Sequence, residues 1–407
     1  MKNLSIIFGK TVQKISKLRG GGSALPGLLV EKIDPNFAKT ILSSLKNGVV
    51  VVSGTNGKTT TTKIITELLR GQGLRVFTNN TGSNFLRGVI SSILKEITLS
   101  GKFDYDIAVL ELDEAHAVKF IEKVPVDYTI LLNAQRDQLD RYGEIDHVVD
   151  LLQIVAEKTK KSVILNREDS RIRNIKANRK IFFGLSDSLI KKIPSEDRIN
   201  SSLEKSKLPA AVTLEKLAEK TVFSCDGRSF SCKLKLKGIY NAFNAAGAVA
   251  LCKTILPKAK VDDLFTSLES VESAFGRGET INIDGIKAEL FLVKNPSAFQ
   301  ISLESFADEN HDYMIAINDK IADGRDVSWL WDVDFSKLPA VSVVSGIRAT
   351  DMALRLKYDN KKFDHVDENL ETALKKFVKS TAKEKRIFAT YTAMLEIRKI
   401  ISGRSIN

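Results

Sequence analysis

Two hydrophobic patterns alternate along the first half of the chain, and they predict strands and helices in turn. Short runs of β-branched and other apolar residues are typical of strands that are covered on both faces. Such runs lie at 49–52, 74–78, 107–110, 128–132 and 162–165. Helical spacing of apolar residues follows at 59–70, in a segment that ends near 94, and at 148–158. This alternation predicts an α/β fold with a mostly parallel sheet flanked by helices.

The two ends of this segment have weaker patterns. Residues 3–18 have helical spacing with lysines between the apolar positions, and Gly20–Gly22 ends that pattern. Asp34 and Pro35 begin a second expected helix that runs to about Leu45. Residues 186–217 are polar and rich in lysine, which predicts a loop or an irregular helix.

The last third of the chain repeats the alternation after an alanine-rich helix at 242–254. Strands are expected near 289–292, 313–317, 340–344 and 387–389. Helices are expected near 296–306, 351–356, 370–380 and 392–402. These elements predict a second, smaller α/β domain.

A glycine-rich loop between the first strand and the first helix carries the clearest chemical signal. Its backbone N–H groups and the start of the helix are suited to holding phosphate oxygens, so that Lys58 would reach the β- and γ-phosphates and Thr59 would bind Mg²⁺. Val52 stands where the usual pattern has another glycine, so the loop is a shorter form. A chance glycine turn is the alternative, and the flanking strand and helix argue against it. The predicted ATP-binding residues here are Gly54, Thr55, Asn56, Gly57, Lys58, Thr59 and Thr60.

Acidic residues follow the third strand, where open parallel sheets bind their ligands. Glu111 comes at the strand end and is predicted to bind Mg²⁺ directly or through water, although a surface acid is the alternative. Asp113 and Glu114 are weaker candidates. Asp137 and Asp140 fit a second metal or substrate site and a salt-bridged structural loop equally well.

These features divide the chain into four predicted parts. A helical segment packed on the next domain covers 1–45, and a central ATP-binding domain covers 46–273. A linker at 274–280 leads to the C-terminal α/β domain at 281–407. No catalytic nucleophile motif accompanies them, which favours chemistry done by positioning and charge.

Composition narrows the cell compartment and the kinds of partner that we expect. The chain has no apolar run of about eighteen residues and no secretory signal, so we expect neither a transmembrane helix nor export. Three cysteines make no disulfide framework and suggest a reducing cytoplasm. The net charge of +12 fits a lysine-rich surface, an anionic substrate or a membrane face. Without an arginine-rich tract or a zinc-finger or RNA-binding motif, no nucleic-acid partner is expected.

The glycine loop resembles that of the Mur ligase superfamily, which also contains folylpolyglutamate synthase. Further stretches resemble the MurT family within it, and the likeness runs from about residue 20 to the C-terminus. These stretches are 110–115, 136–144 (RDQLDRYGE), 240–244, 274–279 (AFGRGE), 322–331 (ADGRDVSWLW), 345–352 and 390–394.

The resemblance implies a specific reaction. Members of the family use ATP and Mg²⁺ to activate the α-carboxylate of D-glutamate in the stem peptide of lipid II as an acyl phosphate. Ammonia from a GatD-type class I glutamine amidotransferase then gives D-isoglutamine. The resemblance therefore implies a cytoplasmic heterodimer that meets lipid II at the inner face of the membrane.

The resemblance also extends to single residues. Lys58 and Thr59 match the phosphate and Mg²⁺ positions, and Glu111 matches the Mg²⁺ carboxylate. Asn241 and Asn244 match the asparagines at a helix start that lie near the nucleotide. The linker arginine of the family corresponds to Arg277.

A C-terminal acidic motif corresponds to Asp323 and Asp326, and the resemblance implies that one of them completes the Cys-His pair of the partner. Which one it is stays open. The two carboxylates read as part of an exposed glycine turn just before Trp329 and Trp331, where a protein interface and a structural core are both plausible readings.

The region 185–235 departs from the family pattern. Many MurT chains carry a four-cysteine zinc ribbon there, whereas this chain has only Cys225 and Cys232. Residues 221–237 alternate instead like a hairpin with a turn at Asp226 and Gly227. Zinc is therefore not expected.

Two other functions are compatible with the residues. One is a Mur-type or folylpolyglutamate-type ligase that adds an amino acid rather than ammonia, and 322–331 argues against it. The other is a nucleotide-binding protein without turnover, and the intact Lys58, Thr59 and Glu111 argue against that.

Overall fold

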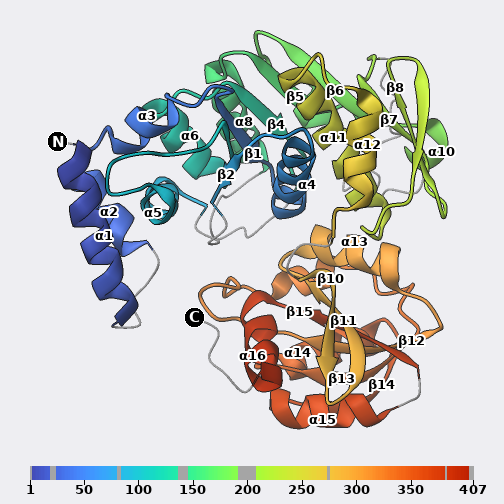
Figure 1. Ribbon diagram of the computed structural model, residues 1–407. Coiled ribbons are helices and arrows are strands. Elements are labelled where there is room, and N and C mark those ends of the chain that lie inside the picture. The colour runs from blue at the N-terminus through green and yellow to red at the C-terminus, as the bar shows by residue number, and fades with distance from the viewer. Residues whose placement is uncertain are drawn as a thin grey trace.

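The computed structural model describes residues 2–18, 24–79, 84–135, 145–190, 208–272, 276–380 and 383–402. Figure 1 shows two sheets, each with its own helices, and the N-terminal helix α1 (Lys2–Leu18) at the outer edge of the larger unit. The α/β fold class predicted from the sequence is confirmed. Within the described ranges, no helix is both long and apolar enough to cross a membrane.

The larger sheet has nine strands in the order β2-β3-β1-β4-β5-β6-β7-β8-β9. The first seven strands in this order pair in parallel, and β8 and β9 add an antiparallel hairpin at one edge. The bounds are β1 Val49–Ser53, β2 Val76–Thr78, β3 Ile107–Glu111, β4 Tyr128–Leu131, β5 Ser162–Asn166, β6 Lys180–Leu185, β7 Val212–Lys216, β8 Thr221–Cys225 and β9 Arg228–Cys232.

Helices cover both faces of this sheet, and the valines of β1 show why a run of four is needed there. Val50 and Val52 belong to the core under α4, α11 and α12, whereas Val49 and Val51 belong to the core on the opposite face. A strand buried on both faces loses the usual alternation of apolar and polar residues. The helices are α2 Leu25–Ile33, α3 Phe37–Leu42, α4 Lys58–Gly71, α5 Leu86–Glu96, α6 Glu114–Lys123, α8 Ile145–Lys158, α9 Ser170–Arg173, α10 Asp187–Ile190, α11 Ile239–Ile255 and α12 Val261–Glu269.

The smaller sheet has six strands in the order β10-β11-β15-β12-β13-β14, antiparallel only between β10 and β11. The flanking helices pack on the two faces of this sheet through two apolar cores. The bounds are β10 Arg277–Ile283, β11 Ile286–Leu292, α13 Pro296–Phe306, β12 His311–Ala316, a 3₁₀ helix η2 Ser328–Asp332, β13 Ala340–Ser345, α14 Ala349–Tyr358, β14 Lys362–Asp367, α15 Leu370–Ser380, β15 Glu384–Ala389 and α16 Tyr391–Ser402.

Several elements are absent from the sequence-based prediction. Helix α2 carries Pro26 and Gly27, which usually indicate a break, but Pro26 lies in the first turn, where no N–H is needed. Gly27 lets α2 approach α5 closely, because a Cβ there would lie 1.9 Å from the carbonyl oxygen of Arg87. Strands β6, β7, β10 and β14 and helix α12 are also additions. The prediction of loop or irregular helix for 186–217 is thus wrong for β7, and Arg277, predicted in a linker, begins β10.

The hairpin predicted at 221–237 is present as β8 and β9. Its turn residues Asp226 and Gly227 both have positive φ, which matches the right-handed twist of the two strands. Cys225 pairs with Arg228 beside the turn, and Cys232 pairs with Thr221 at the other end. Both cysteines are buried in the core, so the hairpin is held by apolar packing.

We predict that the purified protein carries no stoichiometric zinc. Two cysteines at opposite ends of a hairpin cannot close a tetrahedral site, and the described residues contain no group of three or more side chains suited to a metal ion. Elemental analysis of the native protein tests this. One zinc per chain would contradict the prediction and would require ligands other than these cysteines.

Candidate active site

The loop from Gly54 to Gly57 joins the buried strand β1 to helix α4 at the centre of the larger sheet. Gly54 and Gly57 have φ values of 120° and 91°, which side-chain-bearing residues rarely adopt. A Cβ on Gly57 would also lie 2.7 Å from the side-chain nitrogen of Asn244. The loop therefore brings backbone N–H groups and a helix N-terminus together in the arrangement that binds phosphate.

Thr59 and Glu111 meet at the end of β3. The Thr59 hydroxyl donates a hydrogen bond of 2.9 Å to Glu111 Oε1, and the Asn84 amide donates to the same oxygen at 3.0 Å. Asn79 exchanges two hydrogen bonds with the backbone of Glu111, which fixes the strand end. A hydroxyl and a carboxylate are the oxygen ligands that Mg²⁺ uses together with water and phosphate. These residues fit the predicted magnesium site, to which the structure adds Asn79 and Asn84.

The Lys58 ammonium lies against its own loop and beside two carboxylates. Its Nζ donates a hydrogen bond of 2.7 Å to the carbonyl oxygen of Gly54 and lies 3.2 Å from Asp113 Oδ1. A second carboxylate, that of Glu114, lies 3.8 Å away. The buried ammonium is thus held by its own loop and paired with acids.

The charge of Asp113 depends on cations from several elements. Burial opposes its ionisation, but the charges of Lys58, Lys294 and His116 outweigh burial and hold its pKa below the ordinary value. For Arg277 burial is the larger effect. It lowers the pKa of the guanidinium, although the nearby charge of Glu111 raises it. The acids at this end of the sheet are therefore balanced by basic residues, two of which follow residue 276.

One pocket gathers predicted site residues from distant parts of the sequence. It lies between the two sheets, and its walls come from the glycine loop, the start of α11, β10, β11 and α13. Asn241 lines it while donating a 2.7 Å hydrogen bond to the carbonyl oxygen of Lys237. The predicted residues that the pocket brings together are Asn56, Gly57, Thr60, Asn241, Asn244 and Arg277.

A hydrogen-bond network around Asn56 contains residues that the sequence reading missed. The Asn56 backbone N–H donates to Asn133 Oδ1 at 2.8 Å, and the Asn133 amide returns a bond of 2.9 Å. The Asn56 side chain bonds Gln135 at 2.9 Å, and Asn295 approaches it at 3.4 Å. Asn295 also caps α13 through Ala298 N. A polar residue followed by Pro296 at a helix start was the available signal for it.

The two C-terminal acids lie in different environments. Asp323 is buried and accepts hydrogen bonds from Thr392 N at 2.7 Å and Lys320 N at 3.1 Å, as well as from the Thr392 hydroxyl. Burial raises its pKa despite these bonds. Asp326 is exposed, and hydrogen bonds from the Ser328 side chain and from Ser328 N, the latter 2.8 Å long, lower its pKa. The prediction of an exposed turn is therefore wrong for Asp323 and confirmed for Asp326.

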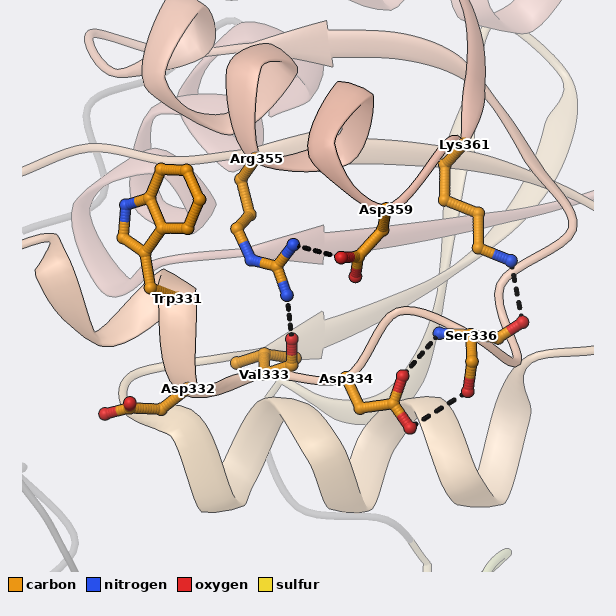
Figure 2. Close-up of a pocket in the computed structure, with 8 residues that line it drawn as sticks. All are labelled: Trp331, Asp332, Val333, Asp334, Ser336, Arg355, Asp359 and Lys361. Atoms are coloured by element: carbon orange, nitrogen blue, oxygen red, sulfur yellow. Dashed lines mark hydrogen bonds and ion pairs between the residues drawn. The ribbon is translucent and has the colours of Figure 1, made fainter.

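The residues after this turn form a surface pocket on the smaller unit. Figure 2 shows the Trp331 ring beside the Arg355 guanidinium, whose carbon lies 5.4 Å from the ring centroid. Arg355 donates a 2.7 Å bond to the Val333 carbonyl oxygen and pairs with Asp359. Half of the Trp331 surface is exposed, so this tryptophan is not a core residue.

One stretch of the sequence-based site cannot be placed. Asp137 and Asp140, for which a ligand site and a structural loop were both open, lie outside the described residues. The same is true of the rest of 136–144.

Two family descriptions match separate parts of the chain. Residues 52–252 match the Mur ligase middle domain, and residues 292–394 match the MurT ligase C-terminal domain. The first range contains the glycine loop, Glu111 and Asn244, and the second contains both C-terminal acids.

Curated relatives extend this likeness over nearly the whole chain. The lipid II isoglutaminyl synthase (glutamine-hydrolyzing) subunit MurT of Streptococcus pneumoniae is 28% identical, covering 99% of this chain and 97% of the relative. The corresponding subunit of Staphylococcus aureus (strain COL) is 28% identical over 87% of each chain. Among solved structures, the MurF ligase of Thermotoga maritima in complex with ADP has a TM-score of 0.69 at 16% identity, covering 92% of this chain and 85% of that chain.

We predict that Glu111→Gln weakens the Mg²⁺-dependent part of nucleotide binding on the order of tenfold. The amide still accepts a hydrogen bond from Thr59, but it no longer supplies a negative charge to the ion. Titration of a fluorescent ATP analogue across a Mg²⁺ series measures the effect. Glu67→Gln, on helix α4 and paired only with Arg70 in the described contacts, is the control for a lost carboxylate charge. An unchanged Mg²⁺ dependence would exclude Glu111 as the metal carboxylate.

Proposed function

We propose that this chain, which belongs to the MurT family of the Mur ligase superfamily, is the synthetase subunit of a lipid II isoglutaminyl synthase. As an ATP-dependent carbon–nitrogen ligase, it would convert the α-carboxylate of D-glutamate in the lipid II stem peptide to the amide. The observation that carries the proposal is the joining of a Lys58–Thr59–Glu111 phosphate site to a MurT-type C-terminal domain in one chain.

The reaction would proceed in two steps. A carboxylate oxygen of the substrate attacks the γ-phosphorus of ATP, and the bond to the β-phosphate oxygen breaks to release ADP. Ammonia then attacks the acyl carbon, loses a proton and displaces phosphate, which leaves the amide. Phosphoryl transfer of this kind depends on positioning and on charge stabilisation rather than on a protein nucleophile.

Lys58 would stabilise the negative charge of the phosphates after exchanging its partner Asp113 for a phosphate oxygen of ATP. It is held by Gly54 O and by Asp113, because a buried cation needs an anionic or polar partner. Phosphate oxygens of ATP would replace Asp113 as its anionic partner. Thr59 and Glu111 would hold Mg²⁺, which neutralises charge on the phosphates when it is bound.

The buried cysteines of this chain favour a separate subunit as the source of the nitrogen. Glutamine hydrolysis by a class I amidotransferase needs a reactive thiolate, and the three cysteines of this chain are buried. Burial raises the pKa of Cys225 and Cys252, and it raises that of Cys232 to about 12, so all three remain thiols at neutral pH. We infer that ammonia comes from a GatD-type glutaminase partner.

The surface around Asp326 is suited to such a partner. Five large apolar side chains are exposed between residues 321 and 358, and exposed aromatic groups beside polar residues are typical of protein interfaces. The exposed side chains are Ile321, Trp331, Ile347, Leu354 and Tyr358. Asp326, unlike Asp323, could meet a histidine of the partner without unfolding its own loop.

The lipid-linked substrate also bears on location. We propose that the protein acts in the cytoplasm at the inner face of the membrane, where the stem peptide of lipid II is accessible. This is consistent with the absence of a membrane-spanning helix among the described residues.

Lys58→Ala should reduce ATP-dependent amidation of lipid II on the order of 10²-fold or more, because it removes a charge aimed at the transferred phosphoryl group. Amide formation can be followed by mass spectrometry with ammonium as the nitrogen source. Lys95→Ala, an exposed lysine on α5, should have wild-type activity. Near wild-type turnover of the Lys58 variant would refute the assignment, and use of an amino acid in place of ammonia would indicate an amino-acid-adding ligase.

Asp326→Ala should abolish glutamine-driven amidation in the presence of the partner while leaving amidation by concentrated ammonium intact. The reason is that a carboxylate orients the histidine of a Cys-His pair, whereas free ammonia bypasses glutamine hydrolysis. Parallel assays with the two nitrogen sources measure the split.

Asp323→Ala is the informative comparison for that experiment. It leaves the partly buried Thr392 N–H without its acceptor and should lower the free energy of unfolding by about 1–3 kcal/mol. Any loss of activity should then affect both nitrogen sources alike. A selective loss of glutamine use with the Asp323 variant, and none with the Asp326 variant, would reverse the assignment.

A further inference from the structure

Helix α1 packs on the protein with a side made of Ile6 and of small or polar residues. Ser5, Ile6, Gly9 and Ser16 are buried, and Ser5 donates a hydrogen bond of 3.2 Å to Asp34. A Cβ on Gly9 would lie 2.7 Å from side-chain atoms of Leu94 and Val30, so the absence of a side chain at Gly9 lets α1 approach α2 and α5 closely. These contacts fix which side of the helix faces outward.

The outward side of α1 carries the large apolar residues. Leu4 is 73% exposed, Ile7 51% and Ile15 47%, and Phe8 is also exposed. At 100° per residue, Leu4, Ile7, Phe8 and Ile15 fall within about a third of the helix circumference. A surface helix normally presents the opposite arrangement, with its apolar stripe against the core. We call these four residues the α1 apolar stripe.

Basic residues border the α1 apolar stripe. Lys10 and Lys14 lie one helical turn apart beside Ile7, and Lys14 is exposed. Residues 1–30 contain five Lys and Arg residues and no Asp or Glu. The segment therefore combines an exposed apolar stripe with positive charge only.

We propose that α1 is an interfacial helix that binds an anionic lipid bilayer, with the α1 apolar stripe inserted between headgroups and Lys10 and Lys14 beside lipid phosphates. An apolar side with a lysine border is the pattern that lies in the plane of a membrane surface. A second copy of the chain is a poorer occupant, because it would bring two wholly basic segments together. Figure 1 shows that α1 lies at the edge of the larger unit, away from the smaller sheet.

The proposal goes beyond the proposed reaction and does not rest on it. Vesicles that contain phosphatidylglycerol and phosphatidylcholine, but no lipid II, test it with the full-length chain. The protein should float with these vesicles, should bind phosphatidylcholine vesicles much more weakly, and should be released by high salt. Equal binding to neutral vesicles, or none to anionic vesicles, would overturn the proposal.

Two variants locate the contact. Ile7→Gln/Ile15→Gln keeps helix-compatible residues and should reduce vesicle binding on the order of tenfold or more, because two apolar side chains that would insert into the bilayer are lost. Lys10→Gln/Lys14→Gln should weaken binding only to anionic vesicles. Ile286→Gln/Val366→Gln, at exposed positions of the smaller unit, is the matched control and should bind as the wild type does.

Circular dichroism and ATP-analogue binding establish that each variant is folded. Vesicle binding that survives the Ile7/Ile15 substitutions would place the membrane contact elsewhere and refute the proposal. Analytical ultracentrifugation tests whether a second copy of the chain, rather than a membrane, covers the α1 apolar stripe. A wild-type dimer that becomes monomeric in the Ile7/Ile15 variant would show that a second copy covers the stripe instead.

Discussion

The hydrogen bonds of Asn56 connect the glycine loop, the residues that follow β4 and the first helix of the smaller unit at the candidate active site. Its backbone is held in both directions by Asn133 at the end of β4, and its side chain reaches Gln135 and Asn295. Asn295 caps the first helix of the smaller unit, so the glycine loop contacts both units through one residue. Pairing of buried polar groups on all sides restricts the loop to one conformation, because an unpaired amide there would be costly.

The charges around this loop balance one another. A buried lysine needs an anionic or polar partner, and Lys58 finds one in Asp113 and another in its own loop carbonyl. Cations from beyond residue 276 complete the balance through Lys294 and Arg277. Under the proposed function, ATP would enter a site that is already balanced, and its phosphates would take over the cation that Asp113 holds. Binding and rearrangement of Lys58 would then be one event.

The smaller unit has two surfaces with different chemistry. Its Asn295 end contributes to the pocket beside the glycine loop, while its Trp331 end is exposed and carries Asp326. Buried Asp323 fixes the turn between them by accepting from Thr392 at the start of α16. This separation is consistent with ammonia production on a partner and ligation on this chain. The α1 apolar stripe adds a third surface, at the edge of the larger unit.

Local patterns in the sequence were sufficient for the fold class, for the glycine loop and for most helices and strands. Periodicity depends on neighbouring residues, so β1 and α13 could be predicted closely, while α2 was hidden by Pro26 and Gly27. The direction of a side chain depends on contacts made across the fold. Only the tertiary structure therefore separated buried Asp323 from exposed Asp326, paired Lys58 with Asp113, and turned the apolar side of α1 outward. Burial and partner distance decide these features, and neither is encoded by spacing along the chain.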